Sequence, residues 1–154
     1  MNILMVCYGN ICRSPIAEGI MKSKLDQYKI DGIVDSAGII GYHAGEAPDK
    51  RAIYVAGLYH IDISKQIARQ FQKEDFKNFD HILTLDKMVQ EEIVSLAKTP
   101  DETGKVKLLM EFAGIFNTPE VPDPYYGDSE GFETVFKMID EACDKIVKTI
   151  QFPK

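Results

Sequence analysis

Short apolar runs alternate with longer helical patterns along this chain, and this alternation restricts the possible folds more than any other feature. Four runs have the length and apolar content of buried strands: Asn2–Val6, Gly32–Ser36, Asp80–Leu85 and Val106–Leu109. Because helical patterns separate them, the runs predict βαβ units rather than hairpins. The expected fold class is α/β, a single compact doubly wound domain over residues 1–154 in which helices cover both faces of a four-stranded parallel sheet.

The segments between these runs carry the signals of helices, turns and one rigid loop. The first helix has Pro15 near its first turn, where the missing N–H of proline costs nothing. Ala37-Gly38 is typical of a turn, and the proline-rich segment Thr118–Gly127 predicts a loop. Pro100 is expected to lie beyond the end of a helix as a stop signal. The further helices are predicted over Ala47–Tyr59, Met88–Ala97 and Gly131–Ile150.

The segment that follows the first strand is the most unusual part of the sequence. In an open parallel sheet, ligands bind beyond the carboxyl ends of the strands, and the first run ends directly at Cys7-Tyr8-Gly9-Asn10-Ile11-Cys12-Arg13-Ser14-Pro15. Gly9 and Asn10 tolerate left-handed backbone angles, so the N–H groups of this loop can turn inward and form a nest. The helix that follows adds partial positive charge at its N-terminus. We therefore expect an anion site built largely from backbone.

Three side chains would give this anion site its chemistry. A nest favours the thiolate form of a cysteine, so Cys7 is expected to be an ionised nucleophile. Arg13 offers a planar fork of donors that matches two oxygens of a phosphoryl group, and Ser14 can donate its hydroxyl to the Cys7 sulfur. The bare spacing of cysteine and arginine is common by chance. Its position between a strand and a helix, with Gly, Asn, Ser and Pro in these places, favours catalysis over a buried cysteine and a surface arginine.

A second segment supplies a candidate acid. Attack of sulfur on phosphorus expels an alkoxide or phenoxide, which needs a proton donor on the opposite side. Asp123 lies in the rigid sequence Val121-Pro122-Asp123-Pro124-Tyr125-Tyr126, and an aryl substrate could rest against Tyr125. A proline-rich turn that contains an aspartate is more often only a turn, so both interpretations of Asp123 remain open at this point.

Composition and charge exclude several classes of function. The formal net charge of −6 argues against non-specific nucleic-acid binding, which requires a basic face. No apolar run approaches the roughly 18–20 residues of a membrane span. Three cysteines make an odd count, so a disulfide framework is not expected, and Cys143 reads as a buried apolar residue. His43, His60 and His81 lack ligand spacing, so no metal site is predicted. We expect a cytoplasmic protein.

Taken together, the two segments resemble the low-molecular-weight protein tyrosine phosphatases. The family's nucleophile loop matches Cys7 to Pro15, and its acid loop matches Asp123-Pro124-Tyr125. Nearly the whole chain takes part in the resemblance, because intermediate positions also match: Asp35-Ser36-Ala37-Gly38, Tyr42, Gly45, Asp49, Arg51-Ala52, Ala68-Arg69-Gln70 and Phe79-Asp80.

The resemblance implies a reaction and a set of roles. Cys7 would form a phosphocysteine, Arg13 would bind phosphate, and Asp123 would act first as acid and then as base for water. Neither a metal nor an organic cofactor is implied, and the substrates would be tyrosine-phosphorylated proteins or peptides, with a monomer favoured. Cys12 matches a cysteine that can form a reversible disulfide with the nucleophile and protect it from overoxidation. The remaining implied positions are the phosphate-binding loop (Tyr8, Gly9, Asn10, Ile11, Cys12 and Ser14), Ser36 as loop support, and Tyr42 and Tyr125 as substrate walls.

The sequence also departs from the family pattern. Gln66 stands where a histidine is frequent, so the network that supports Asn10 is expected to be altered. Lys50 replaces a frequent proline and Ile39 a frequent threonine, and none of the three changes touches a reacting group.

Several rival functions share the loop. Protein-arginine phosphatases typically carry threonine where this chain has Ile11, which disfavours that activity. Thioredoxin-coupled arsenate reductases need further cysteines after the third strand, and residues 81–100 contain none. A non-catalytic phosphoprotein-binding module would not need Cys7, Arg13 and Asp123 together.

Overall fold

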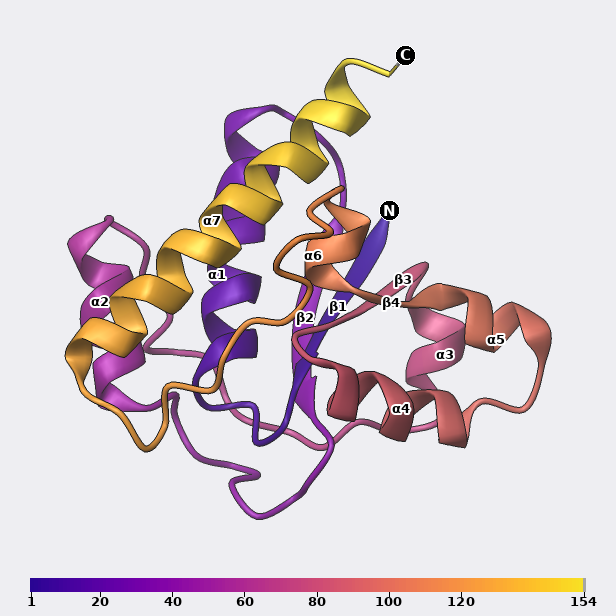
Figure 1. The fold of residues 1–154 in the computed structure, drawn as a ribbon, viewed down its shortest axis with the longest axis horizontal. Helices are drawn as coiled ribbons and strands as arrows, with labels where there is room; N and C mark the ends of the chain where they lie inside the picture. The colour runs from indigo at the N-terminus through magenta and orange to yellow at the C-terminus, as the bar shows by residue number, and fades with distance from the viewer. Residues whose placement is uncertain (154) are drawn as a thin grey trace.

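The computed structural model describes residues 1–153 and shows a parallel sheet enclosed by helices (Figure 1). The strand order is β2-β1-β3-β4, and every strand pair is parallel. The predicted α/β class, with a four-stranded parallel sheet and helices on both faces, is therefore confirmed. The elements are β1 (Asn2–Cys7), α1 (Arg13–Gln27), β2 (Ile33–Gly38), α2 (Lys50–Leu58), α3 (Asp75–Asn78), β3 (His81–Thr84), α4 (Lys87–Leu96), α5 (Pro100–Lys105), β4 (Val106–Leu108), α6 (Leu109–Phe112) and α7 (Ser129–Gln151).

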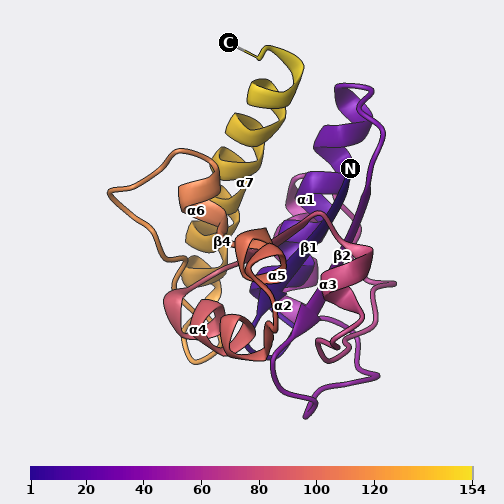
Figure 2. The ribbon, with the colours of Figure 1, turned by 90° about the vertical axis from the view of Figure 1, so that its right-hand side faces the viewer.

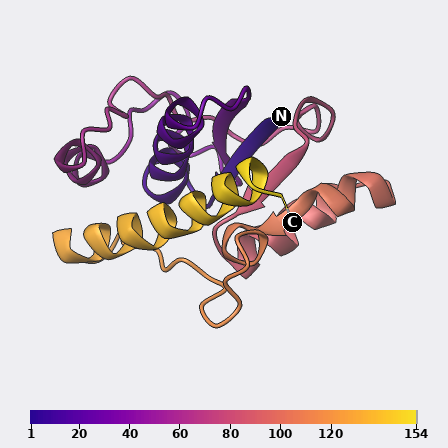
Figure 3. The same cartoon turned by 90° about the horizontal axis from the view of Figure 1, so that it is seen from above.

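The core lies on both faces of the sheet, because β1 is apolar and buried over residues 3–6. Ile3 and Met5 point into a cluster formed with α1, α2, α6 and α7, whereas Leu4 and Val6 point into a second cluster with α3 and α4. This alternation follows from the period of two along a strand, and burial on both faces explains why residues 3–6 include no polar side chain. Figure 2, turned by 90°, and Figure 3, seen from above, show α7 running alongside α1.

The strand order places the site. The chain passes from β1 to β2 on one side and then returns to β3 on the other side of β1, so the order reverses at the carboxyl end of β1. The loop of residues 8–12 and the start of α1 lie at this point. In Figure 1 the orange segment that precedes α7 runs past the same end of the sheet.

Several boundaries differ from the expectation by one to three residues, and the contacts explain two of the differences. Ala37-Gly38 is not a turn: β2 continues through Gly38, which pairs with Cys7. Pro100 does follow the end of α4, but it also begins α5, with the Thr99 hydroxyl accepting a hydrogen bond from the Glu102 N–H as N-cap.

Within residues 1–153, no helix combines the length and the apolar character that crossing a bilayer requires.

Candidate active site

The loop between β1 and α1 folds around one left-handed residue. Asn10 has φ of 60°, a region that few residues other than glycine and asparagine adopt. Behind the loop, Gly38 at the end of β2 approaches it so closely that a Cβ there would lie 2.8 Å from the carbonyl carbon of Gly9. Glycine at position 38 therefore allows β2 to support the loop by direct backbone packing.

The buried thiol of Cys7 faces two hydrogen-bond donors. Its Sγ lies 2.9 Å from the Ser14 Oγ and accepts a hydrogen bond from the Asn10 backbone N–H at 3.3 Å. The Ser14 Oγ already accepts a hydrogen bond from the Asn10 Nδ2 at 2.8 Å, so the hydroxyl proton of Ser14 can point at the sulfur. The Cys7 sulfur therefore has two neighbouring groups that can donate hydrogen bonds to it.

Arg13 is only 2% exposed, and its guanidinium lies between the carboxylates of Asp86 and Asp123. Its Nη1 donates to the Asp86 Oδ2 at 2.6 Å and to the Val121 carbonyl at 3.0 Å, and its Nη2 lies 3.6 Å from the Asp123 Oδ2. Burial lowers the pKa of Arg13, but the negative charges of Cys7 and Asp86 outweigh burial and raise this pKa above its ordinary value. Both hydrogen bonds that Arg13 makes within residues 1–153 come from Nη1, which leaves Nε and Nη2 to bind an anion.

Asp123 lies at the mouth of the site with a side chain that is 43% exposed. Its Oδ1 accepts a hydrogen bond from the Tyr125 N–H at 3.1 Å. The loop that carries it is joined to the sheet, because the Val121 N–H donates to the Leu85 carbonyl at 2.8 Å beyond the end of β3. Arg51 of α2 holds the other end of the loop through hydrogen bonds to the Tyr125 and Gly127 carbonyls, each at 2.9 Å.

These groups surround a pocket with a volume of about 380 Å³, a size within the range of small-molecule sites. Cys7, Arg13 and Asp123, of which Asp123 lies far from the other two along the chain, all line it. Its lining consists of Cys7, Tyr8, Gly9, Ile11, Cys12, Arg13, Ile40, His43, Asp86, Met88, Asp123, Tyr125 and Tyr126.

The aromatic walls differ in part from the expectation. Tyr125 lines the pocket as predicted, whereas Tyr42 is 81% exposed and does not belong to the lining. His43 takes the wall position, with its ring edge-on to Tyr42 at a centroid distance of 4.8 Å and its Nδ1 3.1 Å from the Glu46 Oε2. Sequence reasoning missed His43, Asp86, Met88 and Ile40. The position of Asp86 directly after the third strand was the one available signal.

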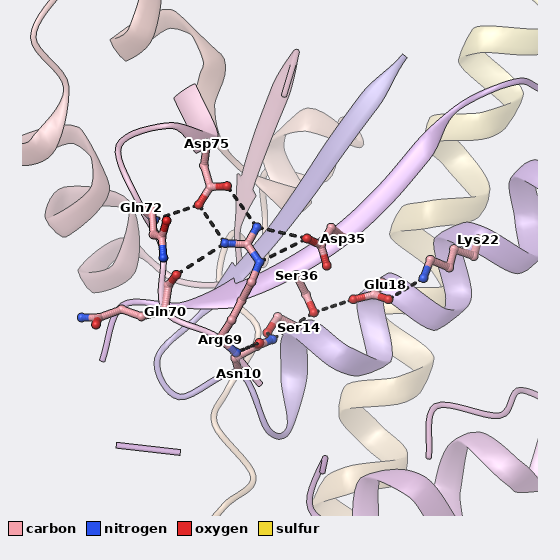
Figure 4. Close-up of polar contacts among 10 residues, drawn as sticks. All are labelled: Asn10, Ser14, Glu18, Lys22, Asp35, Ser36, Arg69, Gln70, Gln72 and Asp75. Carbon is pink, nitrogen blue, oxygen red and sulfur yellow. Dashed lines mark hydrogen bonds and ion pairs between the residues drawn. The ribbon is translucent and has the colours of Figure 1, made fainter. Parts of the chain in front are cut away.

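Hydrogen bonds connect Asn10 to Ser14, Ser36 and Arg69 (Figure 4). The Asn10 Nδ2 donates to the Ser14 and Ser36 hydroxyls at 2.8 and 2.9 Å, and the Asn10 Oδ1 accepts a hydrogen bond from the Arg69 backbone N–H at 3.0 Å. Gln66 takes no part in this network, because its Nε2 donates to the Pro15 carbonyl at 3.1 Å instead.

The other cysteines are buried thiols. Burial raises the pKa of Cys12, as does the nearby negative charge of Asp49, so Cys12 stays protonated at neutral pH. Burial likewise raises the pKa of Cys143, which lies in the core against α1. All three cysteines are free within the part of the chain that the structure describes.

The chain is similar to known proteins along nearly its whole length. A family model described as low molecular weight phosphotyrosine protein phosphatase matches residues 2–153. A putative low molecular weight protein-tyrosine-phosphatase of Synechocystis is 38% identical over 152 residues, which cover 97% of this chain and 96% of the relative. The crystal structure of a protein tyrosine phosphatase from Entamoeba histolytica, with Hepes in its active site, superimposes with a TM-score of 0.91 at 35% identity and covers 97% of this chain and 96% of that one. The crystal structure of a Drosophila arginine phosphatase has a TM-score of 0.92 at 29% identity, with 100% of both chains covered.

Proposed function

Because the chain belongs to the low molecular weight phosphotyrosine protein phosphatases, a family of cysteine-dependent enzymes, we propose that it hydrolyses phosphotyrosine in proteins or peptides through a phosphocysteine on Cys7. The observation that carries the proposal is the buried Cys7 Sγ within hydrogen-bond distance of the Ser14 hydroxyl and the Asn10 N–H. This thiol lies in the same pocket as Arg13 and Asp123.

In the first step, the Cys7 thiolate attacks the phosphorus atom and a sulfur–phosphorus bond forms. The bond from phosphorus to the tyrosine oxygen breaks, and Asp123 gives its proton to that oxygen, so that neutral tyrosine leaves. Nε and Nη2 of Arg13 and the loop N–H groups bind the phosphoryl oxygens, where negative charge is concentrated in the transition state. Because Asp86 fixes the Nη1 end at 2.6 Å, the guanidinium is already oriented before the substrate arrives.

In the second step, water attacks the phosphocysteine. The Asp123 carboxylate takes a proton from this water, the sulfur–phosphorus bond breaks, and Cys7 leaves as a thiolate while inorganic phosphate is released. The Ser14 hydroxyl and the Asn10 N–H stabilise the sulfur as it regains its negative charge. No step in this sequence calls for a redox change or a cofactor.

The lining of the pocket supports an aromatic phosphate ester as substrate. The rings of Tyr8, His43 and Tyr125 line the wall, and a phenyl ring can stack against them while its phosphate reaches Cys7. We assign the enzyme to the cytoplasm, where thiols such as Cys7 stay reduced, and we propose that it acts as a monomer.

The test compares wild type, Cys7→Ser and Asp123→Ala on peptides that carry phosphotyrosine, phosphoserine or phosphoarginine, without added metal. We expect turnover of phosphotyrosine that Cys7→Ser abolishes and Asp123→Ala lowers by about 10²–10⁴-fold, the usual size of a general-acid contribution. Trapping the ³²P-labelled intermediate with acid would identify the phosphocysteine. Tight binding of phosphopeptides without turnover would refute the proposal.

If the enzyme prefers phosphoarginine, Cys7 remains the proposed nucleophile, and the proposed substrate changes from phosphotyrosine to phosphoarginine. This second candidate rests on the similarity to the Drosophila arginine phosphatase. Ile11, which lines the pocket, is the position to exchange: Ile11→Thr should improve phosphoarginine turnover relative to phosphotyrosine if the side chain at this position selects the substrate.

A further inference from the structure

Asn10 depends on three hydrogen bonds to keep its left-handed conformation. Its amide has two N–H donors and one oxygen acceptor, and all are used: the donors by Ser14 and Ser36, the acceptor by the Arg69 backbone N–H. The same residue presents its own backbone N–H to the Cys7 Sγ at 3.3 Å. Any displacement of the Asn10 amide therefore moves a donor away from the sulfur.

The backbone of Arg69 is fixed from two directions (Figure 4). Its carbonyl accepts a hydrogen bond from the Gly38 N–H at 2.9 Å, which joins it to the end of β2. Its guanidinium forms a paired contact with Asp75, with Nη1 and Nη2 each 3.0 Å from a different carboxylate oxygen. Nε and Nη2 also reach the Asp35 Oδ2 at 3.2 and 3.1 Å.

The Arg69 clamp, meaning Arg69 held between Asp35 and Asp75, joins three segments. Asp35 lies in β2, next to the Ser36 that holds the Asn10 Nδ2, and Asp75 lies in α3. Asp75 is only 5% exposed, and its Oδ2 also accepts a hydrogen bond from the Gln72 N–H at 2.8 Å. A buried carboxylate with this many partners holds the guanidinium in one orientation.

We propose that Arg69 is a positioning residue for the phosphate loop: the clamp fixes the peptide whose N–H holds Asn10, and through Asn10 it fixes the donor at the Cys7 sulfur. Arg69 does not line the pocket and touches no reacting atom, so its effect is indirect. Gln66 strengthens the dependence on Arg69, because it bonds to Pro15 rather than to Asn10. The inference rests on the proposed phosphatase function only for its kinetic consequence.

The experiment measures two properties of the loop without substrate, the alkylation rate of Cys7 and its protection by phosphate, and one with substrate, kcat. For Arg69→Gln we expect the rate of Cys7 alkylation by iodoacetamide at neutral pH to fall by about ten-fold, the size of effect expected when one hydrogen bond to a charged group weakens. Protection of Cys7 by inorganic phosphate should require about ten-fold more phosphate, and kcat should fall by a similar factor. Arg69→Lys, which keeps the charge but not the planar fork, should give an intermediate value. Mass spectrometry assigns the alkylated residue, and the raised pKa of Cys12 should make that thiol slow to react with iodoacetamide at neutral pH.

Lys24→Gln is the matched control. Lys24 forms ion pairs with Asp140 and Asp144 at 3.0 and 3.5 Å between α1 and α7, away from the pocket lining. It should lower stability without changing alkylation, phosphate protection or kcat. A folded Arg69→Gln variant that matches wild type in these three measurements would overturn the inference.

If Arg69→Gln does not fold, Asp35→Asn tests the inference in its place. This variant weakens the contact of Arg69 with Asp35 and leaves the contact with Asp75 intact. A reduction of about three-fold in alkylation rate and in phosphate protection would support the inference, and wild-type values would overturn it. Alkylation and phosphate protection need no substrate. Failure of wild type to hydrolyse phosphotyrosine would therefore refute the proposed function and leave this test intact.

Discussion

Ser14 and Cys12 show how differently two neighbouring side chains of one loop can act. Ser14 accepts a hydrogen bond from the Asn10 Nδ2 and can donate its own proton to the Cys7 Sγ, so it links the support of the loop to the reacting atom. Cys12 lines the same pocket but remains a protonated thiol, because burial and the Asp49 charge raise its pKa. The two sulfurs therefore differ in their surroundings: two hydrogen-bond donors face Cys7, whereas burial and a nearby carboxylate act on Cys12.

The difference leads to a prediction about oxidation. We expect hydrogen peroxide to oxidise Cys7 to a sulfenic acid, with which the Cys12 thiol would condense to form a disulfide and release water. We expect dithiothreitol to restore most of the activity of peroxide-treated wild type and clearly less in Cys12→Ser. The measurement is recovered activity after matched peroxide doses, with Cys143→Ser as the control. Equal recovery in Cys12→Ser and wild type would mean that Cys12 only packs the loop.

At the scale of elements, the start of α2 connects the two loops of the site. The Asp49 N–H donates to the Ile11 carbonyl at 2.7 Å, and two residues later Arg51 holds the Tyr125 and Gly127 carbonyls. Asp49 also caps the helix and pairs with Arg51 at 2.9 Å. One helix end therefore sets the distance between the phosphate loop and the loop that carries Asp123.

Arg51→Met should loosen only the acid loop. We expect kcat for phosphotyrosine to fall by about ten-fold or more, because small displacements of a catalytic group are costly, while the inhibition constant of inorganic phosphate stays near its wild-type value. Steady-state kinetics with phosphate as inhibitor separates the two effects. Lys50→Met, an exposed neighbour on the same helix, is the control. Equal losses in phosphate binding and kcat would show that Arg51 supports the whole pocket.

The elements also show what sequence reasoning could and could not predict. The phosphate loop was predictable because its signals are local: an apolar strand, then residues tolerant of left-handed angles, then Pro15. His43 and Asp86 were not predicted as pocket residues, because ordinary residues of these types gain their roles only when distant segments meet. Ala37-Gly38 was interpreted as a turn, but pairing with β1 extends the strand, which overrides the local preference. The short helix α5 was missed because Pro100 fits the first position of a helix as well as the end of one.

At the scale of the whole molecule, stability and chemistry depend on different residues. The larger apolar cluster joins the inner face of α7 to α1 and β1, and its members Ile139 and Val147 are fully buried away from the pocket lining. The pocket is lined instead by loop residues, by the end of β1 and by the starts of α1 and α4. Changes in the α7 core should therefore affect folding without altering the reaction.

Ile139→Ala tests this separation. We expect the free energy of unfolding, measured by urea denaturation, to fall by about 2–5 kcal/mol because a buried side chain is replaced by a cavity. Well below the unfolding temperature, kcat and KM for phosphotyrosine should stay at wild-type values. Glu141→Ala, at an exposed position of the same helix, should change neither property. A large loss of kcat in folded Ile139→Ala would show that the core and the site are coupled.

The partners that meet in the pocket lie far apart in the chain, and this has a consequence for biosynthesis. Arg13 donates to the Val121 carbonyl and lies near Asp123, so the guanidinium reaches its full set of partners only after more than a hundred further residues have been translated. A nascent chain that has emerged only through β3 carries Cys7 and Arg13 but neither the acid loop nor the helix α7 that covers α1. We therefore expect the pocket to be complete only late in synthesis, when docking of the last third of the chain brings Asp123 to the wall that Cys7 and Arg13 also line.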